Sequence, residues 1–367
     1  DRAFMTRLVD GTIEYMLQLD YIIDSFSKTK VRKMKPFIRN LLRMSVYQIK
    51  YMDAVPDSAV CNEAVKLAKR HKFAQLSGFV NGVLRNIARN IDSVQFDTLS
   101  IRYSMPQWIV DRFVAAYGEK KAEEIFKAFH SKSTISIRTN LTRCTPDELC
   151  VMLEAEGVTV TAVDELNYAF VISGFDYLNG LQSFRDGLFY VQDISSMLVA
   201  QTAAPKKGDY VIDVCAAPGG KSTHIAELLQ GSGHVLARDL TDNKVDMIEE
   251  NIERHGLNNM SAEVWDATVP DADSAGKADI LICDLPCSGL GVLGRKKDIR
   301  YKMTPESVDE LAALQRQILD TVHTYVKPNG VLVYSTCTID EAENEDNVRW
   351  FIEKHPEFEL DKSFAEG

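Results

Sequence analysis

The second half of this chain alternates short apolar, β-branched runs with helical patterns, and this alternation constrains the fold more than any other feature. The apolar runs are DYVIDV, HVLARDL, ADILICDLP and GVLVYSTC, and the helical patterns between them include KSTHIAELLQ and NKVDMIEENIERHG. Strands that alternate with helices form a parallel sheet with helices on both faces. We therefore predict an α/β fold from Gly187 onward.

The first half divides into a helical region and a small mixed region. Up to residue 97, apolar residues recur at helical spacing, as in FMTRLVDGTIEYMLQLDYIIDSF, which predicts an all-helical domain. Residues 98–186 begin at a junction rich in proline and aromatic residues. They continue with the alternating stretches TISIRTNLT and VTVTAV on either side of the helical pattern PDELCVMLEAEG. This order predicts a small α+β module.

A stretch of small residues follows the first strand of the predicted parallel sheet. These residues are Cys215, Ala216, Ala217, Pro218, Gly219, Gly220 and Lys221. Small side chains let a ligand approach the backbone, and the helix that follows offers free N–H groups. The stretch matches neither the Walker loop nor GxGxxG, so a phosphate site is the weaker interpretation.

Acidic residues follow three further strands at the same predicted edge of the sheet. Asp239 closes the next strand, where a carboxylate can bind both hydroxyls of a ribose. Asp266 and Asp284 follow two later strands. Each alone is more often a cap or turn residue, but together they favour a site for a nucleoside-bearing cofactor without a pyrophosphate.

Two cysteines stand where predicted strands give way to loops. Cys287 follows the run ILICDLP, and Cys337 follows VLVYST. The seven cysteines are an odd number in a chain too large to need disulfides, which favours free thiols in a reducing compartment. A zinc site is the weaker alternative, since no second pair or nearby His completes the CxxxC spacing of Cys283 and Cys287. The cysteines interpreted as ordinary small apolar residues are Cys61, Cys144, Cys150 and Cys283.

Basic residues are clustered although the net charge is −11, a charge that alone argues against a nucleic-acid partner. The stretches KTKVRKMKPFIRNLLR, KLAKRHKF and GRKKDIRY are strongly basic. A solvated helix face and a phosphate-contacting surface both explain such stretches. The candidate RNA-contacting residues are Lys30, Arg32, Lys33, Arg295, Lys296, Lys297 and Arg300.

No apolar stretch approaches the roughly 20 residues that a membrane span needs, and no secretory leader pattern is present. We expect a soluble, cytoplasmic protein without a membrane or metal partner.

Four motifs together resemble those of the RNA 5-methylcytosine methyltransferases: DVCAAPGGK, DLPCSGLGV, RKKDIRY and YSTCT…ENEDNV. The helical region resembles the NusB-like domain of their bacterial Sun/RsmB-type branch, which modifies 16S ribosomal RNA. The resemblance covers nearly the whole chain. It implies a NusB-like RNA-binding domain over residues 1–97, a small RRM-like α+β module over 98–186, and a Rossmann-like, class I S-adenosylmethionine-dependent methyltransferase domain over 187–367.

The resemblance also implies roles for the residues at the sheet edge. S-adenosylmethionine would be held by the loop from Cys215 to Lys221 with Asp239, Asp266 and Asp284. Cys337 would be the nucleophile and Cys287 the second, product-releasing cysteine. Cytosine chemistry is consistent with these roles, because a thiolate that adds reversibly to C6 makes C5 nucleophilic. Cys287 would assist loss of the C5 proton, and Asp284 would contact N3 and the exocyclic amine.

The sequence departs from the family pattern at two positions. Leu285 stands where the family usually has Ala, and Lys297 stands where it usually has Pro. The sequence also begins without Met and stops at Gly367, before the closing strands and the DGFF-like segment usual in the family. We therefore expect a truncated C-terminus.

Other functions explain less of the sequence. A DNA cytosine-5 methyltransferase would use Cys287 as nucleophile and follow it with a large target-recognition region, for which the roughly 50 residues before Cys337 leave no room. An amino-group methyltransferase would need a Pro-Pro-aromatic motif that DLPCSG lacks. A non-catalytic RNA-binding assembly factor would leave the paired cysteines and the acids unexplained. A tRNA or another RNA is the alternative substrate to 16S ribosomal RNA.

Overall fold

The computed structural model describes residues 2–131 and 134–362. These residues group into two compact units. One unit comprises the chain up to Ser131 together with Val292–Pro305, and the other comprises the remaining described residues. Within the described ranges, none of the helices combines the length and apolar character needed to cross a membrane.

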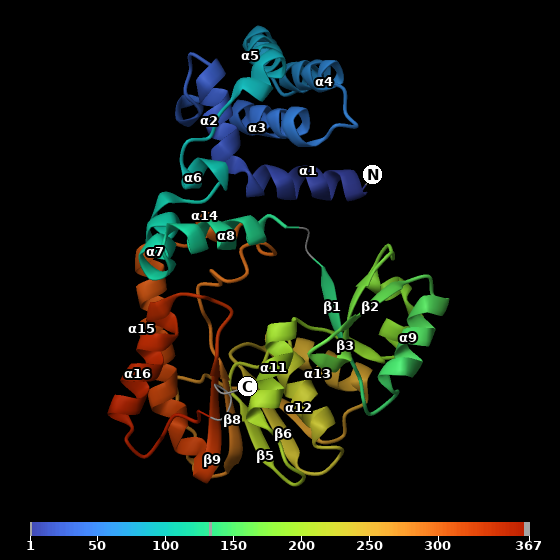
Figure 1. Ribbon diagram of the computed structural model, residues 1–367, viewed down its shortest axis with the longest axis vertical. Helices are drawn as coiled ribbons and strands as arrows, with labels where there is room; N and C mark the ends of the chain where they lie inside the picture. The colour runs from blue at the N-terminus through green and yellow to red at the C-terminus, as the bar shows by residue number, and fades with distance from the viewer. Residues whose placement is uncertain (1, 132–133, 363–367) are drawn as a thin grey trace. The chain divides into compact units, whose positions relative to one another are not determined.

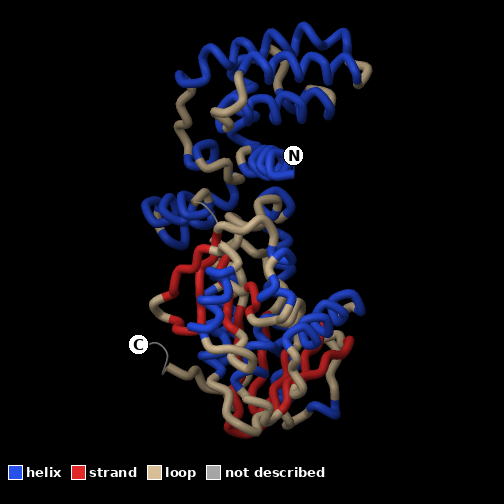
Figure 2. The backbone as a smooth tube through the Cα atoms, turned by 90° about the vertical axis from the view of Figure 1, so that its right-hand side faces the viewer, coloured by secondary structure: helices blue, strands red, loops and turns tan. Residues whose placement is uncertain are grey.

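The first unit contains only helices and loops among its described residues (Figure 2). Its α-helices are α1 (Arg2–Glu14), α2 (Met16–Phe26), α3 (Pro36–Tyr51), α4 (Asp57–Arg70), α5 (Ser77–Asn90), α6 (Leu99–Arg102), α7 (Gln107–Tyr117), α8 (Glu119–Phe129) and α14 (Ile299–Lys302). Short 3₁₀ turns are η1 (Val31–Lys33), η2 (Ala74–Leu76) and η3 (Ile91–Ser93). The predicted helical region is confirmed. Helices α6 to α8 belong to the same unit, beyond the boundary at residue 97.

The core of this helical unit is built by the apolar faces of α2, α3 and α5. Leu19, Leu42 and Leu84 are fully buried in one cluster. Helix α1 packs closely on α3 at Gly11, where an added Cβ would lie 2.0 Å from Cζ of Tyr47. A side chain at that point would overlap the Tyr47 ring, which would have to move out of its packed position.

The second unit begins with a small antiparallel sheet in the order β2-β3-β1-β4. Its elements are β1 (Ile135–Thr139), α9 (Pro146–Ala155), β2 (Thr159–Val163), β3 (Leu166–Ser173), η4 (Leu178–Gly180), α10 (Gln182–Arg185) and β4 (Phe189–Val191). The predicted strands and the helix between them are confirmed. Strand β4 joins this sheet although it lies beyond residue 186, where the module was predicted to end.

A buried ion pair links the small sheet to the larger part of this unit. The guanidinium of Arg138 in β1 donates hydrogen bonds to the Glu227 carboxylate and, at 3.1 Å, to Oγ1 of Thr223. Both charged side chains are almost completely excluded from solvent. Separating the two charges would leave each without its partner, which is energetically costly. The ion pair therefore holds the small sheet against the larger part of the unit.

The larger part of the second unit is a parallel sheet in the order β7-β6-β5-β8-β9. Its strands are β5 (Tyr210–Asp213), β6 (His234–Asp239), β7 (Met260–Val264), β8 (Ala278–Asp284) and β9 (Val326–Ser335). Its helices are α11 (Ile194–Ala203), α12 (Gly220–Leu228), α13 (Asp242–His255), α15 (Pro305–Val322) and α16 (Glu345–Lys354), with 3₁₀ turns η5 (Ala272–Ser274), η6 (His323–Tyr325) and η7 (Glu341–Glu343).

Alternate strand residues bury on opposite faces of this sheet, each covered by helices (Figure 1). Val211 and Ile280 pack in the cluster that contains Ile225 of α12 and Ile248 of α13. Their neighbours along the strands pack with α15 and α16 on the other face. Both faces of the sheet therefore carry buried apolar residues, which confirms the predicted parallel sheet with helices on both faces.

The order of strands reverses beside β5, the first strand of the parallel sheet. The chain moves outward from β5 to β6 and β7, then crosses to β8 and β9 on the other side. Such a reversal opens a crevice at the carboxyl ends of the strands, where ligands bind in this type of sheet. Asp213, Asp239, Asp284 and Ser335 are the last residues of four of these strands.

Candidate active site

The loop between β5 and α12 brings its backbone close to the end of β6. Gly219 has φ of 100°, a conformation that favours glycine, and its N–H donates to the Ala216 carbonyl at 2.6 Å. The Ala217 N–H donates to Oδ2 of Asp239 at 2.9 Å. The small-residue loop and the acid predicted to share a site therefore lie in contact.

The strand-end acids Asp239 and Asp266 have different surroundings. Asp239 is nearly buried, and its Oδ1 accepts from the Leu240 N–H and from Nζ of Lys244, each at 2.8 Å. Asp266 is exposed, and hydrogen bonds from the hydroxyl and N–H of Thr268 lower the pKa of its carboxyl. A rigid carboxylate beside a small-residue loop fits the ribose of a nucleoside cofactor.

Asp284 at the end of β8 accepts hydrogen bonds from side chains on both sides of this strand. Nζ of Lys221, at the start of α12, donates to its Oδ2 at 2.5 Å. Oγ of Ser335, at the end of β9, donates to its Oδ1 at 3.0 Å. A carboxylate has about four lone-pair sites, so this partly exposed group retains acceptor capacity for a ligand. Lys221 therefore supports Asp284, a role that the sequence did not suggest.

The two cysteines singled out in the sequence face each other across neighbouring strand ends. Sγ of Cys287 lies 3.2 Å from Sγ of Cys337, and the Cys337 N–H donates to Sγ of Cys287 at 3.3 Å. Cys337 is exposed, whereas Cys287 is half-buried. The hydrogen bond with Cys337 and the burial raise the pKa of Cys287, which favours its thiol form. A Cys287 thiol can then donate toward a Cys337 thiolate.

The remaining cysteines lack this arrangement. Cys61 and Cys283 are buried, and Cys144, Cys150 and Cys215 are partly buried. Burial raises the pKa of each of these five thiols. Such thiols are weak nucleophiles because the thiolate is the reactive form.

Sequence reasoning missed a buried polar network beneath the cysteine pair. Glu343 is fully buried and accepts hydrogen bonds from the N–H and hydroxyl of Ser288 and from Nε2 of Gln315. Gln315 also donates to the Pro286 carbonyl at 2.8 Å. Glu343 stands in the acid-rich run ENEDN after Cys337, a pattern that by itself favours solvated side chains and did not indicate a buried acid.

Sequence reasoning also missed Asp213, a fully buried acid at the end of β5. Its carboxylate oxygens accept from Oγ of Ser222 at 2.5 Å and from the Cys215 N–H at 3.4 Å. Burial, opposed by the Ser222 hydrogen bond and reinforced by the charge of Asp284, raises the pKa of Asp213 to about 7. The group therefore titrates near neutral pH, and it is hydrogen-bonded to the first residue of the small-residue loop.

We expect Asp213 to make the protein less stable as pH rises from about 4 to about 7. Its raised pKa means that the folded protein keeps a proton that the unfolded chain releases above its ordinary pKa of 3.8. The free energy of unfolding should therefore fall over this window by on the order of 4 kcal/mol. Asp213→Asn removes this titrating group. In urea unfolding, the advantage of the variant over the original protein in free energy of unfolding should therefore grow from pH 5 to pH 8. An advantage that stays constant with pH would contradict the raised pKa.

The predicted RNA-contacting residues differ in exposure, and all lie in the helical unit. Lys30, Arg32, Lys33, Arg295 and Lys296 are exposed. Lys297 forms an ion pair with Glu14 at 2.5 Å. Arg300 is fully buried and donates to the backbone carbonyls of Leu293, Glu14 and Ser104. A guanidinium enclosed by carbonyls cannot reach a phosphate, so Arg300 is corrected from an RNA contact to a packing residue.

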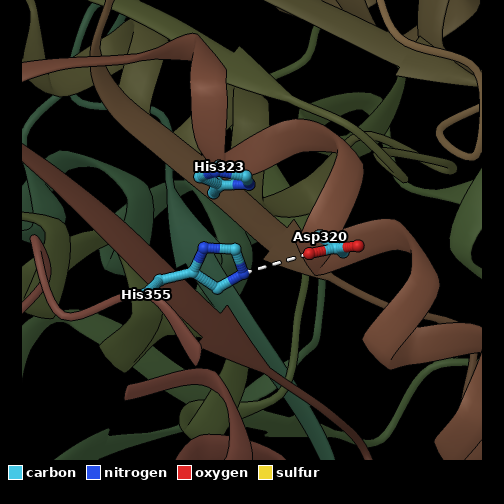
Figure 3. A group of neighbouring side chains, drawn as sticks. All are labelled: Asp320, His323 and His355. Carbon is cyan, nitrogen blue, oxygen red and sulfur yellow. Dashed lines mark ion pairs between the residues drawn. The ribbon is translucent and has the colours of Figure 1, made fainter. Parts of the chain in front are cut away.

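Asp320, His323 and His355 form a group whose spacing suits a metal ion (Figure 3). Oδ1 of Asp320 lies 3.2 Å from Nε2 of His355, but it also pairs with Nζ of Lys354 at 2.7 Å. The two imidazole rings contact each other at 4.0 Å between centroids. A metal ion would have to displace Lys354 from Asp320, so we interpret the group as an ion pair beside packed rings.

The fold and the edge of its parallel sheet define a class, the Rossmann-like S-adenosylmethionine-dependent methyltransferases. The chain belongs to the family described as 16S rRNA methyltransferase RsmB/F, which matches residues 200–367. The NusB family matches residues 1–89, and the RsmF/B-like ferredoxin-like domain matches residues 105–175. These matches confirm the predicted family and the kind of fold predicted for each of the three regions.

Two curated relatives and one solved structure are similar over nearly the whole chain, and a second solved structure is similar over about two thirds of it. A probable ribosomal RNA small subunit methyltransferase B from Bacillus subtilis is 38% identical over 99% of this chain and 82% of its own length. One from Synechocystis is 34% identical, over 98% and 82%. The crystal structure of PH0851 has a TM-score of 0.84 at 26% identity, covering 98% of this chain and 82% of that one. A methyltransferase homologue from Pyrococcus horikoshii has a TM-score of 0.60 at 26% identity, over 69% and 80%.

Proposed function

We propose that this protein transfers a methyl group from S-adenosylmethionine to C5 of a cytosine in 16S ribosomal RNA, through a covalent bond between Cys337 and C6. The observation that carries the proposal is the 3.2 Å contact between the sulfur atoms of Cys287 and Cys337 at the ligand edge of the sheet. A thiol that adds and a neighbour that assists release are what this reaction needs. The relatives named as ribosomal RNA small subunit methyltransferases support the substrate class.

The loop from Cys215 to Lys221 and Asp239 would hold the cofactor, with Asp266 on the adjacent strand end. The loop has small side chains, and Asp239 is fixed beside it by the Ala217 N–H. Backbone N–H groups at the start of α12 and an acid one strand away are the donors and acceptor that a nucleoside with a ribose requires. When bound, S-adenosylmethionine supplies an electrophilic methyl group.

The protein side chains supply the steps that make C5 nucleophilic. Sγ of Cys337 adds to C6, and the electron pair of the C5–C6 double bond becomes available at C5. Asp284 accepts hydrogen bonds from the exocyclic amine and from protonated N3, which favours the addition. After C5 is methylated, Cys287 gives up its own thiol proton to solvent, and its sulfur then accepts the proton from C5. The C–H electron pair then re-forms the double bond as Cys337 departs.

The surroundings of the cysteines support this division of roles. Cys337 is exposed, and a thiol of Cys287 can stabilise a Cys337 thiolate by a hydrogen bond. The raised pKa of Cys287 disfavours it as the attacking thiolate, which argues against the arrangement of DNA cytosine-5 methyltransferases.

The proposal is tested by supplying the purified protein with 16S ribosomal RNA and S-adenosylmethionine. Mass spectrometry of the nucleosides should show 5-methylcytidine, and bisulfite sequencing should find one site that loses its methyl group in cells lacking the gene. Methylation of tRNA alone would show that tRNA, and not 16S ribosomal RNA, is the substrate. A different methylated base would overturn the proposed cytosine C5 chemistry. RNA binding without methylation would favour a non-catalytic assembly factor.

We expect the exposed basic residues of the helical unit to bind RNA through phosphates. Arg32 and Lys33 lie exposed in η1, and the stretch KTKVRKMKPFIRNLLR around them contains no acidic residue. Replacing both by alanine should weaken binding to different RNA sequences equally. The salt slope of log affinity should fall by about 0.7 to 0.9 for each phosphate that the variant no longer neutralises. Filter binding at several salt concentrations measures this slope.

Lys121→Ala is the matched control, because this exposed lysine lies in the same unit but outside the basic stretches. An unchanged slope in the Arg32 and Lys33 variant would show that the stretch is only a solvated face.

A further inference from the structure

Both loops that carry the paired cysteines are attached to one buried carboxylate. Ser288 directly follows Cys287, and its N–H donates to Oε1 of Glu343 at 2.9 Å while its hydroxyl donates to Oε2. The same hydroxyl lies 3.0 Å from Oγ1 of Thr338, which directly follows Cys337. The residue after each cysteine is therefore part of one hydrogen-bonded group centred on Glu343.

The residue next to Glu343 fixes the second loop from its other side. Oδ1 of Asn344 accepts from Oγ1 of Thr336 at 2.6 Å, and its Nδ2 donates to the Thr338 carbonyl at 3.1 Å. Thr336 and Thr338 stand on either side of Cys337. The Cys337 carbonyl also accepts from the Gly291 N–H at 3.2 Å, where an added Cβ would lie only 2.7 Å from that oxygen.

The cysteines themselves lie in loops, beyond the ends of the two neighbouring strands. Strand β8 ends at Asp284 and β9 at Ser335, before either cysteine. Beyond the strand ends, side-chain hydrogen bonds such as these hold the two loops together with the backbone bond from Gly291 to Cys337. The distance between the two sulfur atoms therefore depends on the Glu343 network.

We propose that Glu343 is a positioning residue that keeps Cys287 and Cys337 at the separation needed for addition and release. The inference deepens the proposed function, on whose two-cysteine chemistry it rests. Gln at this position has one acceptor oxygen and an NH₂ group, and that NH₂ would face the donors that Glu343 now accepts. Part of the network would be left unsatisfied in a buried site, which favours displacement of the loops that carry the two cysteines.

The distance between the cysteines can be measured chemically without RNA. Diamide oxidises two neighbouring thiols to a disulfide while its azo bond is reduced to a hydrazine. In the full chain, where the sulfur atoms are 3.2 Å apart, the disulfide should form rapidly. Glu343→Gln should slow its formation about 10- to 100-fold, because effective concentration falls steeply when two groups are misaligned. Peptide mapping identifies the Cys287–Cys337 bond.

Two further readouts separate positioning from folding. With RNA substrate, Glu343→Gln should lower kcat by at least about 10-fold and leave KM for S-adenosylmethionine unchanged, since the cofactor loop is not part of the network. The melting temperature identifies any variant that fails to fold. In that case Ser288→Ala removes one donor with a smaller effect and should slow disulfide formation in the same way.

Glu345→Gln is the matched control, because Glu345 is an exposed acid two residues away and should change neither rate. A folded Glu343→Gln protein with unchanged disulfide formation and unchanged kcat would overturn the positioning role. If no RNA is methylated even by the original protein, the proposed function fails, while the disulfide rates still decide whether Glu343 sets the sulfur separation.

Discussion

Cys337→Ala is expected to abolish methyl transfer and to form no covalent RNA adduct, whereas Cys287→Ala should form an adduct that persists. The asymmetry follows from the order of steps, because a missing nucleophile stops the first step and a missing release group stops only the last. Loss of Cys337 should lower turnover by a factor on the order of 10⁴ or more. A denaturing gel with labelled RNA shows the adduct, and labelled S-adenosylmethionine measures transfer.

Cys150→Ala is a suitable control, because Cys150 lies on α9 of the small module and has no part in the proposed chemistry. An adduct that accumulates with Cys337→Ala instead would exchange the roles and match the DNA-enzyme arrangement. Normal methylation by both cysteine variants would remove covalent catalysis from the mechanism.

Asp284→Asn should lower turnover by about 10²- to 10⁴-fold, the usual contribution of a group that acts on a proton in the reaction. Asn removes the negative charge that would face protonated N3 and also breaks the ion pair with Lys221. In a protein that also carries Cys287→Ala, Asp284→Asn should slow the appearance of the stalled adduct. A slower appearance would show that Asp284 acts before the release step. Quenched-gel time courses measure this rate.

Two variants separate the possible causes of this effect. Lys221→Met removes the ion pair but keeps the carboxylate, so it should slow adduct formation less. Asp279→Asn makes the same substitution at the opposite end of β8, where the carboxylate accepts from Lys327 and from the Tyr210 N–H. Equal rates for Asp279→Asn and Asp284→Asn would show that only strand stability was affected.

The sequence was sufficient to predict the parallel sheet and the residues that lie at the carboxyl ends of its strands. Strands buried on both faces are largely apolar, so β5, β6 and β8 were visible as short apolar runs, although β6 also contains Arg238 and β8 contains Asp279. Because parallel strands end at one edge, residues that follow them, such as Asp239 and Cys287, were correctly expected at that edge. The roles of these residues at the site stay predictions.

The network beneath the cysteines was not predictable from sequence pattern alone. Glu343 lies in a short 3₁₀ turn within an acidic run, where polar residues are normally solvated. Its burial depends on Gln315 of α15 and Ser288 of the β8 loop, both distant in sequence. Asp213 was hidden for a related reason, because an acid at a strand end is ordinarily exposed or bound to a ligand.

The pattern of basic residues also led to a wrong prediction at Arg300, which was expected to contact RNA. The run RKKDIRY has the composition of a phosphate-contacting segment, but partners from α1 and the turn after α6 enclose the guanidinium. Long-range packing of this kind leaves no trace in local composition. The exposed members of the same run, Arg295 and Lys296, retain the prediction.

The membership of Val292–Pro305 in the helical unit has a consequence for protein synthesis. On the ribosome, the helices up to Ser131 emerge before residues 132–291, and the segment that carries Arg300 emerges only afterwards. At about 5 to 20 residues per second, that interval lasts about 10 to 30 s. Throughout it, the carbonyls of Glu14 and Ser104 lack their guanidinium partner. The nascent helical unit therefore lacks this contact until four strands of the parallel sheet have been translated.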